Sequence, residues 1–117
     1  MDCIFCKIAA GEAPAQVIYR DEQVTAFRDI HPKAPTHILI IPNRHFDSLN
    51  VAEESDAALL GHLMLVAKHL AAIDGIQNRG YRLVLNTGPE SGETVFHLHL
   101  HLIGGKPLPL KLDCEEN

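Results

Sequence analysis

The stretch VFHLHLHLIGG, residues 95–105, places a histidine at every second position three times in succession. In a β-strand, successive side chains point to opposite faces and the chain rises about 3.3 Å per residue. The leucines between the histidines then face a core, while the imidazoles share the other surface, about 6–7 Å apart. A helix would spread the same histidines around its circumference. The spacing therefore predicts a strand over 95–103, and we name its three imidazole residues the histidine row: His97, His99 and His101.

Length and composition restrict the class of protein. The 117 residues are enough for one domain with its own core, so we expect a single domain over 1–117 whose last residues, 105–117, form a tail. A net charge of −5 argues against a general binder of nucleic acid or of membrane surfaces, since such binders present basic stripes. No apolar run approaches the roughly 20 residues that span a bilayer. Three cysteines without a secretory signal indicate a reducing compartment, and we expect a cytoplasmic protein.

Apolar runs separated by turn residues predict four more strands. The first two are joined by the turn Asp21-Glu22, which predicts a hairpin, and Pro42 ends the third. The fourth precedes a loop with the sequence GPESGE. The predicted strands cover 16–20, 24–28, 36–42 and 81–87.

Two segments predict helices. Residues 55–73 carry apolar side chains at helical spacing, with Ser55 as the predicted N-cap and Gly75 as the C-terminal stop. The N-terminal segment CIFCKIAAGE predicts a short helix that stops at Gly11. Together the elements predict an α+β domain, with a five-stranded, mainly antiparallel sheet, one long helix and a short N-terminal helix.

The histidine row favours chemistry over packing. Packing gives no reason to gather several titratable groups on one surface, because charging one penalises the next. One possibility is a zinc site that uses two or three of these histidines. Another is covalent catalysis, since a neutral imidazole has a nitrogen lone pair that can attack phosphorus. His99 is the natural nucleophile, because it alone has a histidine on either side.

The pattern His-apolar-His-apolar-His-apolar-apolar at 97–103 resembles the signature of the histidine triad (HIT) superfamily. The resemblance continues through CIFCKIAAGEAPA, AFRDIHPKAPTHILIIPNRH, LLGHLM and GYRLVLNTG, and it spans roughly residues 3–105. Together these motifs resemble the HINT branch, the histidine triad nucleotide-binding proteins. The resemblance implies the HIT-like fold and a homodimer in which two sheets join into one and the long helix contributes to the interface.

The resemblance also implies an activity. It is that of a purine nucleoside phosphoramidase, a hydrolase that cleaves the P–N bond of purine nucleoside 5′-phosphoramidates through a nucleotidyl-histidine, here on His99. His101 matches a residue that contacts the phosphate or leaving group, and His37 one near the base or the catalytic histidine. A carboxylate at Asp29 suits the ribose diol. The implied catalytic residues are His99, His101 and His37, and the implied nucleotide-binding residues are Asp29, Ile30, Leu39, Asn86, Gly92, Thr94, His99 and His101.

Cys3 and Cys6 have the C-x₂-C spacing that zinc half-sites and redox motifs share. The resemblance implies that some relatives complete a structural zinc with two histidines, at positions that match His45 and His97. Such a site is structural, and we expect no cofactor to be required for catalysis. Cys114 is expected to be an ordinary free thiol in the tail.

Three other functions remain open from the sequence. They are a dinucleoside polyphosphate hydrolase, a nucleotide-binding regulatory module and a histidine-ligated metalloenzyme. The chain has no tryptophan, whereas some relatives carry one in the C-terminal tail, so leaving-group preference does not transfer from them. His62 and His69 are expected to be surface or packing residues of the long helix.

Overall fold

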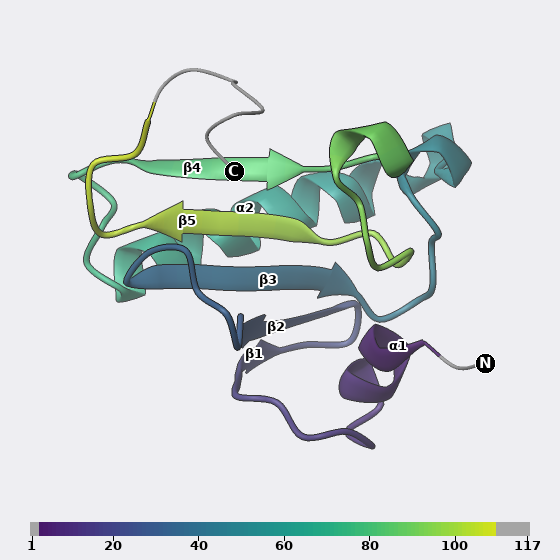
Figure 1. Cartoon of the computed structure of the whole chain (residues 1–117). Helices are drawn as coiled ribbons and strands as arrows, with labels where there is room; N and C mark the ends of the chain where they lie inside the picture. Colours follow the sequence, from purple (N-terminus) through teal and green to yellow (C-terminus); the bar gives the residue numbers. More distant parts are fainter. Residues whose placement is uncertain (1–2, 110–117) are drawn as a thin grey trace.

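Five antiparallel strands form one sheet in the order β1-β2-β3-β5-β4, and α2 crosses one face of it (Figure 1). The computed structural model describes residues 3–109, so the predicted thiol at Cys114 lies outside the described residues. The strands are β1 Val17–Arg20, β2 Val24–Arg28, β3 Thr36–Pro42, β4 Tyr81–Leu85 and β5 Leu100–Gly104. The helices are α1 Ile4–Ala9 and α2 Ala57–Ile73, with 3₁₀ turns η1 Leu49–Val51, η2 Glu54–Asp56 and η3 Pro89–Ser91. The predicted α+β class and its elements are confirmed.

The β1–β2 hairpin is closed by one side chain. Asp21 Oδ1 accepts the backbone N–H groups of Gln23 and Val24, each at 2.8 Å. This is the pattern in which an aspartate replaces backbone acceptors in a tight turn. The predicted hairpin and its turn at Asp21 are therefore confirmed.

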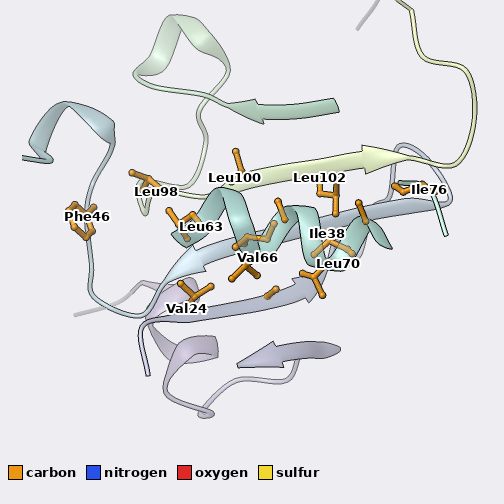
Figure 2. Close-up of a cluster of buried hydrophobic side chains, with 14 residues drawn as sticks. Val24, Ile38, Phe46, Leu63, Val66, Leu70, Ile76, Leu98, Leu100 and Leu102 are labelled. Carbon is orange, nitrogen blue, oxygen red and sulfur yellow. The ribbon is translucent and has the colours of Figure 1, made fainter. Parts of the chain in front are cut away.

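The face of the sheet covered by α2 holds the main core. Leu63, Val66 and Leu70 project from α2 onto the sheet (Figure 2). Burying such a side chain contributes about 1.5–3 kcal/mol, so this layer supplies most of the apolar stabilisation. Within β5, alternate residues are buried, as the leucine spacing predicts. The cluster consists of Val24, Ala26, Ile38, Ile40, Phe46, Leu63, Val66, Ala67, Leu70, Ala71, Ile76, Leu98, Leu100 and Leu102.

The opposite face is covered only in part. α1 buries Phe5 and Ile8 in a second, smaller cluster, which also contains Phe27, Leu39 and Ile41 of β2 and β3. Figure 1 shows α1 beside the end of β3, away from β4. The face that carries the histidines is therefore apolar under α1 and more open toward β4, whose residues are all half-buried.

β5 is shorter than the predicted strand 95–103. It begins at Leu100, so His97 and His99 precede it. The pairing of β3 with β5 ends at Ile40 opposite Leu100. The next residue of β3 whose backbone points toward β5 is Pro42, which has no N–H. The prediction of one continuous histidine strand was wrong, because the sheet loses a donor there. β4 likewise ends at Leu85 and not at 87.

α2 begins later than predicted. Ser55 lies in η2, and Asp56 is the N-cap of α2. Asp56 Oδ2 accepts the N–H of Glu53 at 2.9 Å, within a capping box that the two residues form. The predicted N-cap at Ser55 was therefore wrong. At the other end Gly75 has φ +77°, a left-handed conformation that confirms the predicted stop.

The helical segment Glu54–Ile73 is long and apolar enough to cross a bilayer by length and composition alone, so the prediction that no apolar run approaches this length was wrong. Part of it forms the core layer described above. Other apolar side chains of α2 remain at the surface: Met64 is 50%, Leu65 63% and Ile73 66% exposed.

Asp74 joins the end of α2 to the sheet. Its carboxylate accepts two hydrogen bonds from Arg28 of β2, at 2.8 and 2.9 Å, and one from the Thr36 hydroxyl of β3 at 2.8 Å. A carboxylate at a helix C-terminus is otherwise unfavourable. The Arg28 guanidinium, aided by Thr36, holds the pKa of Asp74 below its usual range.

Asp74→Asn keeps the shape of this side chain and removes its charge. We expect the free energy of unfolding at pH 7 to fall by about 1–3 kcal/mol. Because the folded pKa is below the unfolded one, this contribution is present above about pH 4 and is lost as the pH falls through the folded pKa. Urea unfolding at pH 7 and pH 3 measures it, with Glu22→Gln, an exposed carboxylate, as the control. Equal stability of Asp74→Asn and wild type at pH 7 would contradict the assignment.

Candidate active site

The three predicted catalytic histidines come together on the open face of the sheet. His37 of β3 and His101 of β5 approach within 3.0 Å, from Nε2 to Nδ1. The rings of His99 and His101 have centroids 4.9 Å apart and planes inclined at 62°. The structure therefore gathers residues that are far apart in sequence around the last two members of the histidine row.

The position of the proton on His99 follows from its backbone contact. His99 Nδ1 lies 2.8 Å from the carbonyl oxygen of His97. A carbonyl oxygen only accepts, so Nδ1 carries the hydrogen and donates it. In the neutral ring the lone pair is then on Nε2. His99 is 8% exposed, so this nitrogen is the free lone pair of a nearly buried side chain.

The tautomers of His37 and His101 are set by a chain of donors. His37 Nδ1 accepts the backbone N–H of Lys33 at 3.0 Å, which leaves the hydrogen of the neutral ring on Nε2. That hydrogen is donated to His101 Nδ1, so His101 carries its own hydrogen on Nε2. Asp29 Oδ2 lies 3.4 Å from His37 Nε2, and Asp29 Oδ1 accepts the N–H of His31 at 2.8 Å.

Both histidines of this pair are neutral near pH 7. Burial lowers the pKa of His101 to about 4, and repulsion from His99 and His37 adds to the effect. Burial also lowers the pKa of His37, against the opposing attraction of Asp29. His101 therefore offers a neutral N–H donor rather than a positive charge.

The loop between β4 and the histidine row brackets η3 with two glycines. Gly88 has φ +86° and Gly92 has φ +97°, values that favour glycine. Asn86, at the end of β4, is half-buried, while Gly92 and Thr94 are exposed. Asn86, Gly92 and Thr94, all predicted to bind nucleotide, thus lie on the loop that immediately precedes the histidine row in the sequence.

The two apolar residues predicted near a base differ in exposure. Ile30, after β2, is 82% exposed, whereas Leu39 is 6% exposed in the cluster beneath α1. Leu39 therefore packs beneath the histidines in the cluster under α1, whereas Ile30 presents an exposed apolar side chain just after β2.

A second group, which we name the cysteine–histidine cluster, consists of Cys3, Cys6, His45 and His97, whose ligand atoms all lie within 4.8 Å of one another. His97 Nδ1 is 3.3 Å from Cys3 Sγ, and His45 Nδ1 is 3.2 Å from Cys6 Sγ. The other ring nitrogens donate, His97 Nε2 to the carbonyl of Pro42 at 2.9 Å and His45 Nε2 to Asp47 at 2.6 Å. In both rings the lone pair therefore faces the thiols, as a metal-binding imidazole requires.

The Cys6 thiol of this cluster is protonated without a cation. Burial raises the pKa of Cys6, and the neighbouring Cys3 raises it further. A divalent cation reverses this, because coordination deprotonates a thiol. Two thiolates and two imidazoles match a closed, tetrahedral zinc site.

Asp29, His37 and His101 also place ligand atoms within 4.8 Å of one another. This arrangement does not fit a metal, because Nε2 of His37 carries a hydrogen and donates it to His101. The geometry disfavours the histidine-ligated metalloenzyme that the sequence left open.

Comparison with known proteins identifies the family. The model of the HIT domain matches residues 10–108. The chain belongs to the HIT domain family. It is 47% identical over 107 residues to a purine nucleoside phosphoramidase of Escherichia coli (strain K12), which covers 92% of this chain and 90% of that protein. Because the similarity extends over nearly the whole of both chains, this HIT protein is an enzyme.

Solved structures agree with the fold of this HIT enzyme. A HIT family hydrolase from Legionella pneumophila superposes with a TM-score of 0.91 at 47% identity, covering 92% of this chain and 96% of that one. A Zn-bound histidine triad family protein from Mycobacterium smegmatis superposes with a TM-score of 0.79 at 32% identity, covering 97% and 84%. The predicted HIT-like fold is confirmed.

Two further residues of this HIT enzyme lie at the site without having been predicted from the sequence: Phe5 and Glu93. Phe5 packs edge-on against His99, with ring centroids 5.1 Å apart at 85°. Glu93 is 5% exposed, and its Oε1 accepts the N–H of Gly88 at 2.7 Å, which ties the two ends of the loop together. Its Oε2 has no hydrogen-bond partner among residues 3–109. The apolar spacing of α1 predicts that Phe5 is buried, but no pattern signals its contact or the role of Glu93.

The protonation states of the site are directly measurable. Long-range ¹H–¹⁵N spectra should place the hydrogen of His99 on Nδ1 and that of His101 on Nε2, with His101 neutral down to about pH 4. Since the folded pKa of His101 is below the unfolded value of about 6.5, stability from this residue falls as the pH drops from 6.5 toward 4.

Replacing the donor to His101 provides the matched comparison. His37→Phe should leave His101 as a mixture of tautomers, while His62→Gln, a half-buried residue of α2 bonded to Asp21, should leave the spectrum of His101 unchanged. A His101 ring that is protonated at pH 6 in wild type would contradict the assignment.

Proposed function

We propose that this HIT enzyme is a purine nucleoside phosphoramidase, which hydrolyses the P–N bond of purine nucleoside 5′-phosphoramidates through a covalent intermediate on His99. The observation that carries the proposal is the lone pair of His99 Nε2, set by the bond from Nδ1 to the carbonyl of His97. The similarity to the Escherichia coli enzyme of that name supports the substrate class.

In the first step His99 Nε2 donates its lone pair to the α-phosphorus. A bond between phosphorus and His99 forms, and the P–N bond to the amine breaks with its electron pair on the amine nitrogen. The amine gains one proton from solvent. Phosphoryl transfer depends mainly on positioning and on stabilising charge on the phosphate oxygens. A nucleophile with a fixed tautomer beside a neutral donor, His101, supplies both.

The neighbours of His99 take the supporting roles. His101 donates a hydrogen bond from Nε2–H to a phosphate oxygen or to the leaving group, and His37 holds it in that tautomer. The Thr94 hydroxyl and the N–H groups near Gly92 bind phosphate oxygens. The remaining contacts are Asp29 and Asn86 on the ribose and its phosphate, and Ile30 and Leu39 on the side of the base.

In the second step water attacks the phosphorus of the nucleotidyl-histidine. The bond between phosphorus and His99 Nε2 breaks, and its electron pair returns to the ring. The water loses a proton to solvent, and the nucleoside monophosphate leaves. No step needs a metal ion as a Lewis acid, so we propose that catalysis requires no cofactor.

Replacement of the nucleophile tests this function. His99→Ala should lower kcat for adenosine 5′-phosphoramidate by more than about 10³-fold, because no other group forms the intermediate. The affinity for AMP should change only a few-fold, about 1 kcal/mol or less. Mass spectrometry of quenched wild-type reactions should detect the nucleotidyl adduct on residue 99, and His62→Ala is the matched control.

The substrate panel distinguishes the other functions. Faster turnover of diadenosine polyphosphates than of phosphoramidates would indicate the dinucleoside polyphosphate hydrolase instead. Near-wild-type phosphoramidase activity in His99→Ala would refute the mechanism. Binding of AMP without turnover of either substrate class would indicate a regulatory nucleotide-binding module.

We propose that the cysteine–histidine cluster binds one structural zinc ion. The support is the donor set, with the lone pairs of His45 and His97 turned toward Cys3 and Cys6. The Zn-bound relative from Mycobacterium smegmatis is consistent with it. When bound, zinc would cross-link α1 to the segment that follows β3 and to the segment that precedes β5.

Metal analysis tests the zinc proposal. Wild type purified with zinc should contain about one equivalent, and the double variant Cys3→Ser/Cys6→Ser should contain almost none, since a serine hydroxyl is a poor zinc ligand. Cys114→Ser is the matched control and should retain the metal. The same low zinc content in wild type and the double variant would refute the site.

We propose that two chains associate as a homodimer and that the enzyme acts in the cytoplasm. β4 is an edge strand of the sheet, so the backbone groups on its outer side are available to pair with another strand. The exposed apolar residues Met64, Leu65 and Ile73 of α2 support a partner surface on the same molecule.

A further inference from the structure

His97 belongs to two arrangements at once. Its ring Nδ1 lies 3.3 Å from Cys3 Sγ and 3.5 Å from Cys6 Sγ, within the cysteine–histidine cluster. Its backbone carbonyl accepts the Nδ1–H of His99 at 2.8 Å, within the active site. The residue is 0% exposed. One buried residue therefore connects the thiols to the proposed nucleophile.

The peptide that bears this carbonyl lies outside the sheet. β5 begins at Leu100, so no strand pairing orients the peptide between residues 97 and 98. Its N–H, on Leu98, donates to the carbonyl of Phe46 at 2.7 Å. The ring of His97 is held on one side by the carbonyl of Pro42 at 2.9 Å. On the other side the His97 ring faces the thiols of Cys3 and Cys6. A cation bound by these thiols would therefore affect the direction of the His97 carbonyl.

α1 provides a second connection between the thiols and His99. Cys3 is the N-cap of α1, and its Sγ accepts the N–H of Cys6 at 3.3 Å. Phe5, between the two cysteines, lies edge-on to His99 at 5.1 Å and to Phe27 at 5.4 Å. A helix of six residues is not stable alone, so its place against His99 depends on these contacts.

We propose that His97 is a positioning residue for His99, and that cation binding by the cysteine–histidine cluster fixes this position. The inference rests on the proposed function for its kinetic consequence. Coordination holds the His97 ring by two fixed neighbours, the cation and the carbonyl of Pro42. Without a cation the ring is held toward the thiols only by weak sulfur hydrogen bonds. The carbonyl then varies in direction, and His99 also adopts the tautomer with its hydrogen on Nε2, which cannot attack phosphorus.

His45 is the residue at which to change coordination. His45 joins the cluster from the segment after β3, with its Nδ1 3.2 Å from Cys6 Sγ. Among residues 3–109 it makes no hydrogen bond or ring contact with His99. His45→Ala removes a ligand and one ring contact of His97, 4.9 Å between centroids, but leaves α1, the His97 side chain and its bond to Pro42 in the chain. His45→Cys replaces it with a ligand that closed zinc sites accept. His69→Ala, on the exposed surface of α2, is the matched control.

The experiment uses the full chain, loaded with Zn²⁺ or stripped by chelator, with three readouts: metal content, the ¹⁵N spectrum of His99, and steady-state kinetics. In zinc-free wild type and in His45→Ala we expect His99 to show both tautomers and kcat to fall about tenfold, with KM changed less than about twofold. His45→Cys should bind zinc and restore the single Nδ1–H tautomer and kcat.

Zinc-free protein that keeps the single Nδ1–H tautomer would overturn the inference, as would a kcat within about twofold of loaded wild type. A merely structural role for the cluster predicts a lower melting temperature with an unchanged His99 spectrum, which also overturns it. Failure of the proposed function is recognised separately. In that case loaded wild type turns over no phosphoramidate, and the tautomer comparison still decides whether the cluster positions His99.

Discussion

The hydrogen bond from His99 Nδ1–H to the carbonyl of His97 exists because the sheet stops short of both residues. Pairing between β3 and β5 ends at Ile40 and Leu100, and Pro42 has no N–H with which to continue it. A carbonyl inside the ladder would already be paired with a backbone N–H. Outside the ladder it is available to a side chain, and it orients the imidazole two residues later. The end of the ladder thus leaves the His97 carbonyl free to orient His99, whose lone pair is then on Nε2, where the proposed chemistry needs it.

Neutral imidazoles surround this nucleophile in a chain whose net charge is −5. A protonated neighbour would attract a phosphate more strongly, but it would also penalise any positive charge that develops on His99. Burial resolves the conflict by lowering the pKa values of His37 and His101. Each donates an N–H as a neutral group, in a direction set by the previous donor, Lys33. The same burial makes the fold less stable in acid, because the unfolded chain binds protons that the folded site excludes.

The elements of the fold were predictable because each is marked by local spacing, and the leucines of β5 face the core as expected. The residues at which the strands and helices end were harder to predict. β5 begins late because its pairing stops before Pro42, a residue of another strand. The N-cap of α2 is Asp56 and not Ser55, and the Asp56 carboxylate also completes a capping box with Glu53. The members of the site were marked by the motif. The division of the histidine row, with His97 beside the thiols and His99 beside His101, was implied by the family resemblance, but the ring nitrogen of His97 that meets each partner was not.

The two faces of the sheet are stabilised unequally. α2 packs on a large apolar cluster, whereas α1, with six residues, buries only Phe5 and Ile8. Local opening is easiest where few apolar contacts are buried, so α1 is the element whose opening costs least. It is also the element that lies against His99, through Phe5. Cys3 and Cys6 sit on this helix and link it to His45 and His97, which compensates for its small buried area. The cysteine pair thus helps to hold α1 at the place where its Phe5 packs against His99.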